Sequence, residues 1–475
     1  MATPNYASWT RDDLVNRIRQ LENKGGIPSK SEFAWREQDG KFDFAVHSTR
    51  KIALKFCYSG WEYNGLAYQT TPTPLPTVEG VLYDALVKAR LIDEKQGFEG
   101  CGWEKCGRTD RGVSAAGQVI SLNVRTALAA KATPPSPEIE IETGGDEEDF
   151  ADLFGGGTNN STNSERAPTV EHDYVGILNR LLPESIRMLA WSPVAPTFSA
   201  RHNCTHRHYK YFFSDLHLDV SLMREAASYL VGLHDFRNLC KIDAGKQITV
   251  FLRRILSADI SPVEGDPGMY VLDLVGTAFL YHQVRNIMAI LLLVGRGLEH
   301  PEIVKQLLNV SENAEPGVVE VLARKPEFQM ADGLPLVLWE CGFSDEDVSW
   351  SLFPDRIDRG YAYDRVPAQL QEIHERSRVL ATLNRHFMQK ALDMGHPPAG
   401  VRWRPDSTPY GVKWNHPEGI DILFGAGTSR RLNQYVPLML RKRNDTVDAI
   451  NARWRDGKGA RRAQRDLVVD DGGDE

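Results

Sequence analysis

The apolar segment 278–298, "AFLYHQVRNIMAILLLVGRGL", constrains the fold of this chain more than any other stretch. Its apolar side chains recur at helical spacing as far as Gly295, so we expect a helix that lies in a hydrophobic core. The uninterrupted apolar run 287–294 is too short to cross a bilayer. Arg285 stands inside this helix, and a guanidinium is rarely buried without an anionic partner. Either its side chain reaches the surface, or a carboxylate from another segment pairs with it.

The stretch "GRTDRG" (107–112) offers one such carboxylate. Its two glycines tolerate positive φ angles, which is typical of a tight loop. Asp110 stands between Arg108 and Arg111, whose positive charges favour its ionised form. A strand with alternating apolar residues follows at 119–124. An aspartate on such a loop is either a turn former or a catalyst. From this stretch alone, the turn former is the better interpretation.

Two further stretches combine basic and polar residues. "FSARHNCTHRHYKYFF" (198–213) places basic side chains among aromatic ones, a combination that contacts phosphates and stacks on nucleobases. In isolation, an amphipathic strand explains it equally well. "LVGLHDFRNLCKID" (230–243) is typical of a helix end that leads into an Asx-type turn.

Composition bounds the class of protein. A length of 475 residues predicts two or more domains, and 41% hydrophobic with 25% charged residues is typical of a soluble globular protein. The first residues carry charges where a signal peptide needs an apolar core. The six cysteines show no C-x-x-C spacing, which indicates reduced thiols in the cytosol or nucleus and no metal site.

The net charge of −8 argues at first against a nucleic-acid partner, but the charges are unevenly distributed. The segment 138–152 holds eight acidic residues and no basic one, whereas 430–465 holds eleven Lys or Arg against three Asp. Local basic patches of this kind suit phosphate binding, although solvated faces are their commoner meaning.

Periodicity predicts an alternation of strands and helices. We expect strands at 51–58, 119–124, 186–194, 209–214, 251–260 and 270–276, and helices at 77–91, 172–182, 219–233, 278–298 and 301–309. A short amphipathic helix is expected from Thr10 onward. The residues after 343 are expected to form helices joined by long loops. This pattern predicts an α+β or α/β sheet protein.

Four motifs together resemble the TruA-type tRNA pseudouridine synthases, in the chain order of that family. They are "GRTDRGVSAAGQVISL", "FSARHNCTHRHYKYFF", "GTAFLYHQVRNIM" and "GLPLVLWECGF". The resemblance covers about 50–130 and 170–343. It is nearest to the eukaryotic branch that acts at positions 38 and 39, because of "LKFCYSGWEYNGLAYQ" and the "GVSA" after the aspartate.

The resemblance implies an α+β fold in which two ferredoxin-like (RRM-like) halves share a mixed, largely antiparallel β-sheet with a central catalytic cleft, plus helical extensions. We expect five segments: an N-terminal extension with a short amphipathic helix (1–49), an N-terminal catalytic subdomain carrying Asp110 (50–130), an acidic disordered insertion (131–169), a C-terminal catalytic subdomain (170–343), and a helical or loop extension with a basic stretch and an acidic disordered tail (344–475).

The resemblance also implies the chemistry. Members isomerise uridine to pseudouridine in tRNA, without redox change or energy input, so no cofactor and no metal are expected. Asp110 matches the catalytic aspartate, Tyr209 the tyrosine that stacks on the target base, and Arg285 the arginine that pairs with the aspartate. Residues expected to contact the substrate are Arg108, Arg111, Arg201, His206, Arg207 and Leu336, with Leu338 close to the last.

The implied partner is the anticodon stem-loop of tRNA, with no membrane, a homodimeric enzyme, and a location in cytoplasm and nucleus. Two alternatives stay open. One is a synthase of the same fold acting at positions 27 and 28 or on other RNAs. The other is a non-catalytic protein that binds or folds tRNA, which would have no need of the carboxylate.

Overall fold

A computed structural model describes residues 42–128, 170–352, 365–396 and 408–461. Contacts divide the chain into a unit that ends at His47 and a unit from Ser48 to Glu475. In the first unit, the described residues form one short 3-10 helix, Phe44–Val46. The helix expected from Thr10, the acidic insertion and the acidic tail lie outside the described residues. Everything below concerns the second unit.

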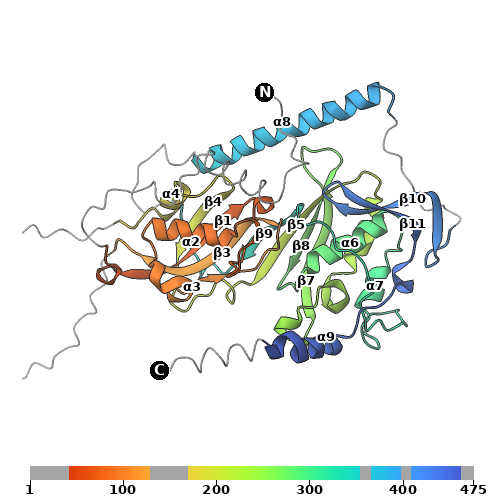
Figure 1. Ribbon diagram of the computed structural model, residues 1–475, viewed down its shortest axis with the longest axis horizontal. Helices are drawn as coiled ribbons and strands as arrows, with labels where there is room; N and C mark the ends of the chain where they lie inside the picture. Colours follow the sequence, from red (N-terminus) through yellow and green to blue (C-terminus); the bar gives the residue numbers. More distant parts are fainter. Residues whose placement is uncertain (1–41, 129–169, 353–364, 397–407, 462–475) are drawn as a thin grey trace, which may run out of the picture. The chain divides into compact units, whose positions relative to one another are not determined.

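One nine-stranded mixed sheet forms the frame of this unit, with the strand order β4-β1-β3-β9-β5-β8-β7-β6 and β2 paired to β3. Its strands are β1 (Thr49–Tyr58), β2 (Glu104–Lys105), β3 (Ser114–Arg125), β4 (Ile186–Pro193), β5 (His206–Ser214), β6 (Gly232–Asp235), β7 (Leu252–Pro262), β8 (Met269–Gly276) and β9 (Leu336–Gly342). Neighbours are antiparallel except β3 and β9, which are parallel. The predicted α+β class with a mixed, largely antiparallel sheet is confirmed (Figure 1).

The first half of the sheet, β4-β1-β3, has its own hydrophobic core. It packs with α2 (Val78–Lys88), α3 (Gly97–Gly100) and α4 (Tyr174–Asn179). Helix α2 begins where expected, because the Thr77 side chain accepts a hydrogen bond from the Gly80 N–H. Residues 174–204, which follow the acidic insertion, contribute α4, β4 and Phe198 to this first core.

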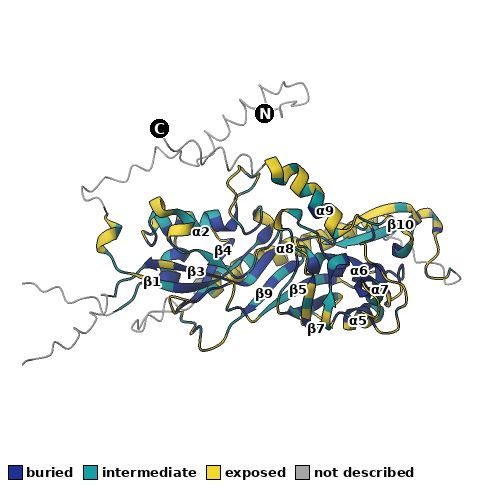
Figure 2. Cartoon of the chain, turned by 90° about the horizontal axis from the view of Figure 1, so that it is seen from below, coloured by how far each residue is buried: buried dark blue, intermediate teal, exposed yellow. Residues whose placement is uncertain are grey.

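The second half, β9-β5-β8-β7-β6, packs with α5 (Val220–Ser228), α6 (Gln283–Gly295) and α7 (Ile303–Leu308). Twelve residues of α6 are buried, so the apolar segment 278–298 lies in the second core as predicted. Figure 2 shows the central strands β3, β9 and β5 mainly in the colours of buried and intermediate residues.

Two sequence predictions fail outside the sheet centre. The segment 230–243, expected as a helix end and turn, instead forms the edge strand β6 and a short 3-10 helix, Arg237–Leu239. Helix α5 has already ended at Ser228, and Gly232, with φ +123, begins β6. The region after 343, expected to hold helices and loops, contains α8 (Arg365–Asp393) and α9 (Val447–Trp454) but also the hairpin β10–β11 (Trp414–Gly425 and Thr428–Tyr435).

Strands β10 and β11 are joined by a tight turn whose residues have positive φ angles. Gly425, Ala426 and Gly427 have φ +85, +51 and +71. Ile420 and Tyr435 are then buried against the second core, and β10 contacts α6. Within the described residues, no helix is both long and apolar enough to span a membrane.

Candidate active site

The loop that carries Asp110 is held from the first half of the sheet. The Tyr58 hydroxyl and the Thr109 hydroxyl share a buried hydrogen bond of 2.6 Å, and the Leu66 N–H donates to the Thr109 carbonyl. The loop also approaches Gly65 closely, because a Cβ there would lie 3.1 Å from the Thr109 carbonyl oxygen, and Gly65 has φ +93. The backbone on both sides of Asp110 is therefore fixed.

The second half supplies two basic side chains to the Asp110 carboxylate, both from the start of α6. His282 Nε2 lies 3.3 Å and Arg285 Nη1 3.8 Å from the same oxygen, Asp110 Oδ2. The side chains of His282, Arg285 and Asp110 are 8%, 13% and 23% exposed. The sequence left open whether Arg285 pairs with a carboxylate or reaches the surface, and in the structure it pairs with Asp110. Its Nε also donates to the Ala331 carbonyl at 2.8 Å, which fixes the plane of the guanidinium.

His282 is a site residue that the sequence reasoning missed. It precedes α6 with φ +59 and ψ 14, a left-handed conformation that costs a non-glycine residue energy. Tyr281 packs on its ring, with centroids 3.8 Å apart. Its Nδ1 is buried and has no hydrogen-bond partner among the residues that the structure describes. The signal was present in "YHQVR", because residues three apart at a helix start lie on one face.

Tyr209 lies on β5 where the two halves meet, and it packs against both hydrophobic cores. Its cross-strand neighbours are Leu274 and Leu338, and its ring meets Phe279 edge to face at 5.0 Å. Burial raises the pKa of the Tyr209 hydroxyl well above its usual value, with a smaller contribution from negative charge that includes Asp110. The phenol therefore stays protonated at neutral pH.

The structure divides the residues expected to contact substrate into exposed and engaged ones. Arg108, Arg111 and Arg201 have exposed side chains, and His206 is half-buried at the start of β5. The Arg207 guanidinium is engaged, because it donates to four backbone carbonyls, those of Cys106, Arg201, Cys204 and Thr277.

The two leucines of β9 are both buried. Leu336 is 4% exposed and belongs to the second core, while Leu338 is fully buried and belongs to the first. Leu336 is thus on the same half as Arg285, and Leu338 is the direct neighbour of Tyr209.

This arrangement can perform nucleophilic or general-base chemistry. One oxygen of Asp110 faces two basic groups, and the carboxylate remains partly open. A protonated phenol next to it can stack on a ring and exchange a proton. Among the residues that the structure describes, no group of three or more His, Cys, Asp or Glu side chains is placed to hold a metal ion.

Comparisons with known proteins agree with this geometry. A family model described as tRNA pseudouridine synthase matches residues 226–344. The chain is 41% identical over 362 residues to the tRNA pseudouridine(38/39) synthase of Saccharomyces cerevisiae, covering 72% of each chain. It is 40% identical to the protein of the same name from Homo sapiens, covering 71% of this chain and 67% of that relative.

A more distant relative is the tRNA pseudouridine synthase A of the archaeon Methanothrix thermoacetophila. It is 34% identical over 265 residues, which are 55% of this chain and 76% of the relative.

Proposed function

Because this chain belongs to the tRNA pseudouridine synthase family, we propose that its Asp110, Tyr209 and Arg285 isomerise uridine at positions 38 and 39 of the tRNA anticodon stem-loop. The observation that carries the proposal is the pairing of Asp110, from the first half, with Arg285, from the second; Tyr209 packs against the cores of both halves. The positions come from the printed names of the yeast and human relatives.

The isomerisation breaks the N1–C1′ bond, turns the base, and joins C5 to C1′. A carboxylate oxygen of Asp110 is available to start this reaction. His282 and Arg285 both approach Oδ2, which leaves Oδ1 for the substrate. That oxygen attacks C1′ or C6, or removes the 2′ proton, and each route needs a charged, oriented carboxylate. Arg285, held in turn by the Ala331 carbonyl, orients it.

Tyr209 has the second role. Its ring stacks on the uracil in the cleft, as aromatic side chains do with bases taken out of a helix. Its hydroxyl, kept protonated by burial, relays the proton that leaves C5 once the new bond has formed. Stacking and proton transfer both require Tyr209 to lie between the two cores, which is its position on β5.

The exposed cations near Asp110 hold the RNA. Arg108 takes the place of the flipped nucleotide, and Arg111, Arg201 and His206 contact the flanking backbone. Arg207 acts indirectly, because its four carbonyl contacts join the loop before β5 to the Asp110 segment. Leu336 lines the uracil pocket from β9.

Site-resolved pseudouridine mapping of cellular tRNA, with and without the protein, tests this proposal. We expect loss at positions 38 and 39 only. Loss at positions 27 and 28 would assign the chain to another branch, and normal tRNA that still binds the protein would favour a non-catalytic binder.

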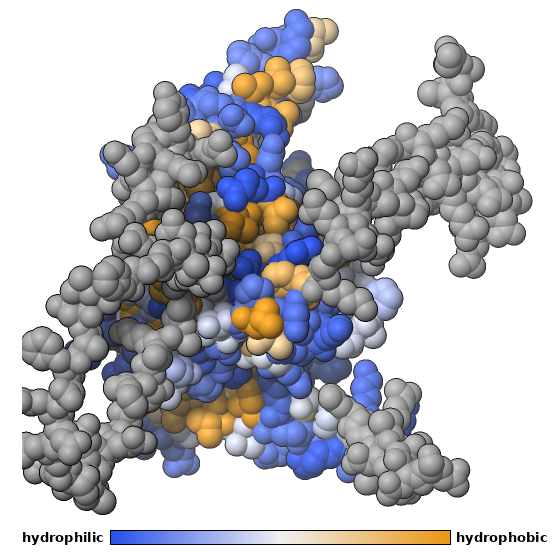
Figure 3. Space-filling view, turned by 90° about the vertical axis from the view of Figure 1, so that its left-hand side faces the viewer, coloured by the Kyte–Doolittle hydropathy of each residue, from blue (hydrophilic) through white to orange (hydrophobic). Residues whose placement is uncertain are grey.

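We also propose that the enzyme is a homodimer and that α8 joins the two copies. Residues 374–391 are exposed on every side of this helix. Val366, Ile373, Leu380 and Phe387 recur every seven residues, the period of a coiled-coil seam. At the top of Figure 3, where α8 lies, hydrophobic side chains appear between hydrophilic ones. A helix so exposed is only marginally stable in water alone.

Both halves of α8 carry basic side chains, Arg376 and Arg378 in the first and Arg385 and Lys390 in the second, so the apolar seven-residue repeat and not charge carries this proposal. Light scattering should give the mass of two chains for the wild type and of one chain for the L380E/L383E variant. The matched control T382E/Q389E adds the same charge off the seam and should stay dimeric. A dimeric L380E/L383E protein would place the interface elsewhere.

Finally, we propose that the enzyme works in both cytoplasm and nucleus. The basic stretches "LRKRND" (440–445) and "GKGARRAQR" (457–465) suit a nuclear address. Imaging of the tagged full chain, with and without substitution of these basic residues, tests this. Exclusion of the unchanged protein from the nucleus would contradict it.

A further inference from the structure

His282, which lies 3.3 Å from the Asp110 carboxylate, also lines a cavity of about 260 Å³. Its polar lining comes from four segments that are distant in sequence. They hold Cys240 and Lys241 after β6, His282 and Asn286 at the start of α6, Lys325 before β9, and Asn444 before α9. None of these side chains has a part in the chemistry proposed above, apart from the His282 contact to Asp110.

A half-buried ammonium group without a carboxylate partner in the described chain lines the cavity. Lys325 Nζ donates to the Cys240 carbonyl at 2.9 Å and to Asn286 Oδ1 at 2.5 Å, and it lies 4.4 Å from the centre of the Phe328 ring. Both acceptors are neutral, and no carboxylate of the described chain forms an ion pair with this lysine. Burial lowers the pKa of Lys325 to about 8. A lysine carries three donors, so one remains for a ligand.

More positive charge surrounds the opening. Lys241 lines the cavity, and its Nζ lies 5.6 Å from the centre of the Tyr281 ring, with Lys246 Nζ at 5.8 Å. Tyr281 in turn packs on His282. The start of α6 adds the positive end of a helix dipole. Most of the exposed lining is apolar, but the basic side chains of Lys241 and Lys325 make the cavity cationic.

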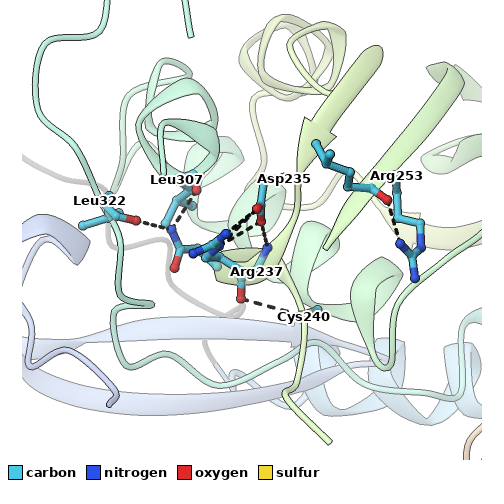
Figure 4. Close-up of polar contacts among 8 residues, drawn as sticks. Asp235, Arg237, Cys240, Arg253, Leu307 and Leu322 are labelled. Carbon is cyan, nitrogen blue, oxygen red and sulfur yellow. Dashed lines mark hydrogen bonds and ion pairs between the residues drawn. The ribbon is translucent and has the colours of Figure 1, made fainter. Parts of the chain in front are cut away.

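The wall that holds Cys240 is rigid. Figure 4 shows Asp235 paired with Arg237, with the Cys240 thiol donating to the Arg237 carbonyl. Asn238 donates to the carbonyls of Leu307 and Leu322 from a fully buried position. On the opposite side, the Asn444 N–H donates to the Lys325 carbonyl at 2.8 Å. Such a frame keeps the cationic groups apart from one another and open to a ligand.

We propose that this cavity binds a backbone phosphate of the tRNA, beside the nucleotide held at Asp110. The inference rests on the proposed function and adds a site to it. A phosphodiester supplies the anion that Lys325 and Lys241 lack, and His282 both lines the cavity and contacts Asp110. Binding of the RNA chain there fixes the ribose of the target next to Asp110.

The site has a protonation signature. The titratable groups that face Lys325 are the Cys240 thiol, Lys241 and His282, and burial keeps the thiol neutral by raising its pKa to about 12. A bound phosphate raises the pKa of Lys325, so the complex takes up a proton when the pH is above about 8. Affinity for tRNA therefore falls as the pH rises through that value.

The test measures tRNA affinity of the full chain by filter binding over a range of salt and pH. Lys241→Met should lower the slope of log K against log salt by about one, and Lys325→Met should do the same and lose the pH dependence. Lys325→Arg keeps its charge at all these pH values, so its affinity should not change between pH 7 and 9. The control Lys88→Met removes an exposed charge on α2 and should match the wild type.

Lys241→Met is the variant least expected to disturb folding, because the Lys241 side chain makes no hydrogen bond within the described residues. An effect of this variant therefore cannot be explained by misfolding. Unchanged salt slopes in both Lys→Met variants would overturn the proposal. So would an effect on inorganic phosphate binding alone, measured by calorimetry, without any effect on tRNA. Either result, obtained while the variants still form pseudouridine, would leave the proposed function intact.

Discussion

The two halves of the sheet contribute to the site in different ways. The first half presents its one reactive group, Asp110, on a loop fixed by backbone contacts and a hydroxyl pair. The second half presents His282 and Arg285 from the first turn of a buried helix, and Tyr209 from a strand. The reactive group and the groups that orient it therefore belong to different cores.

This division means that neither half holds a complete site. The halves meet through the short parallel pairing of β3 with β9, through Tyr209 in both cores, and through the carbonyl contacts of Arg207. The chemistry depends on how well these connections keep Asp110 in register with α6. The predictions below test that dependence from one side and then from the other.

The largest effect is expected for the group of the first half. Asp110→Asn is nearly isosteric but cannot act as an anionic nucleophile or base, so turnover should fall at least about a thousandfold. The loop contacts use the backbone, so the fold and tRNA binding should persist. Single-turnover pseudouridine formation, with a parallel binding assay, measures both. Clear product from the purified variant would refute the role of Asp110.

The next effect is expected from the second half. Arg285→Lys keeps the charge but loses the planar group held by the Ala331 carbonyl, so kcat should fall about a hundredfold. Arg285→Met should fall further, because Asp110 then loses its cationic partner. Thermal unfolding should show whether either variant remains folded. A Lys variant with parental turnover would mean that the pairing does not orient the catalyst.

His282 should give a smaller and more specific effect. Glutamine places an N–H donor near the position of the imidazole Nε2, whereas asparagine accepts the left-handed backbone but is too short to reach Asp110. We expect His282→Asn to lose about tenfold in kcat with KM unchanged, and His282→Gln to recover most of it. If asparagine were the better substitute, the backbone conformation rather than the Asp110 contact would be what matters.

The smallest effect distinguishes the two cores by pH. Burial acts to raise the pKa of Glu171, but hydrogen bonds from Thr126, Ala127, His172 and Arg50 outweigh it and lower the pKa from 4.5 to about 2. Its stabilising contribution, present above pH 4.5, is lost as the pH falls toward 2. Burial raises the pKa of Glu299, in the second core. The pH dependence of its contribution to stability is therefore opposite to that of Glu171: the contribution is present at low pH and is lost as the pH rises.

Hydrogen exchange near pH 3.5 and pH 6, corrected for intrinsic rates, compares the cores. We expect β1 and β3 to lose about 1–2 kcal/mol of protection at the lower pH relative to α6 and α7. Glu171→Gln should remove the difference. An equal loss in both regions, unchanged by the substitution, would show that the two cores open together.

The sequence predicted the centre of the molecule better than its periphery. Six strands of the sheet and the buried helix α6 were predicted from periodicity, but the strand β9, which joins the two halves, was not. For Arg285, the sequence left open whether the side chain pairs with a carboxylate or reaches the surface. The loop at 232–239 was misjudged because its edge strand is four residues long and depends on pairing with β7. The hairpin β10–β11 was missed because its polar, exposed strand β11 has little alternation to detect.

The site was harder to predict than the fold. Sequence patterns alone favoured a turn-forming role for Asp110, and only the resemblance to a family changed that interpretation. His282 gave no signal by composition, since its importance lies in a backbone conformation and in a contact across 172 residues, from 110 to 282. Arg207 was expected at the substrate, yet its guanidinium is occupied by carbonyls. The roles of these side chains stay predictions until the variants are measured.

The seam between β3 and β9 also has a consequence for how the chain acquires its structure. It pairs Ser114 with Val337 and Ala115 with Leu338, residues more than 220 positions apart, whereas β1, β3 and β4 lie within the first 193 residues. The first core can thus form on the ribosome while the rest is still being made, at about 5–20 residues per second. The pairing of β3 with β9 can form only after β9 has been synthesised. Because it joins residues that are far apart in sequence, we expect this pairing to form slowly. Asp110 is in place early, and it becomes an active group only at that last step of folding.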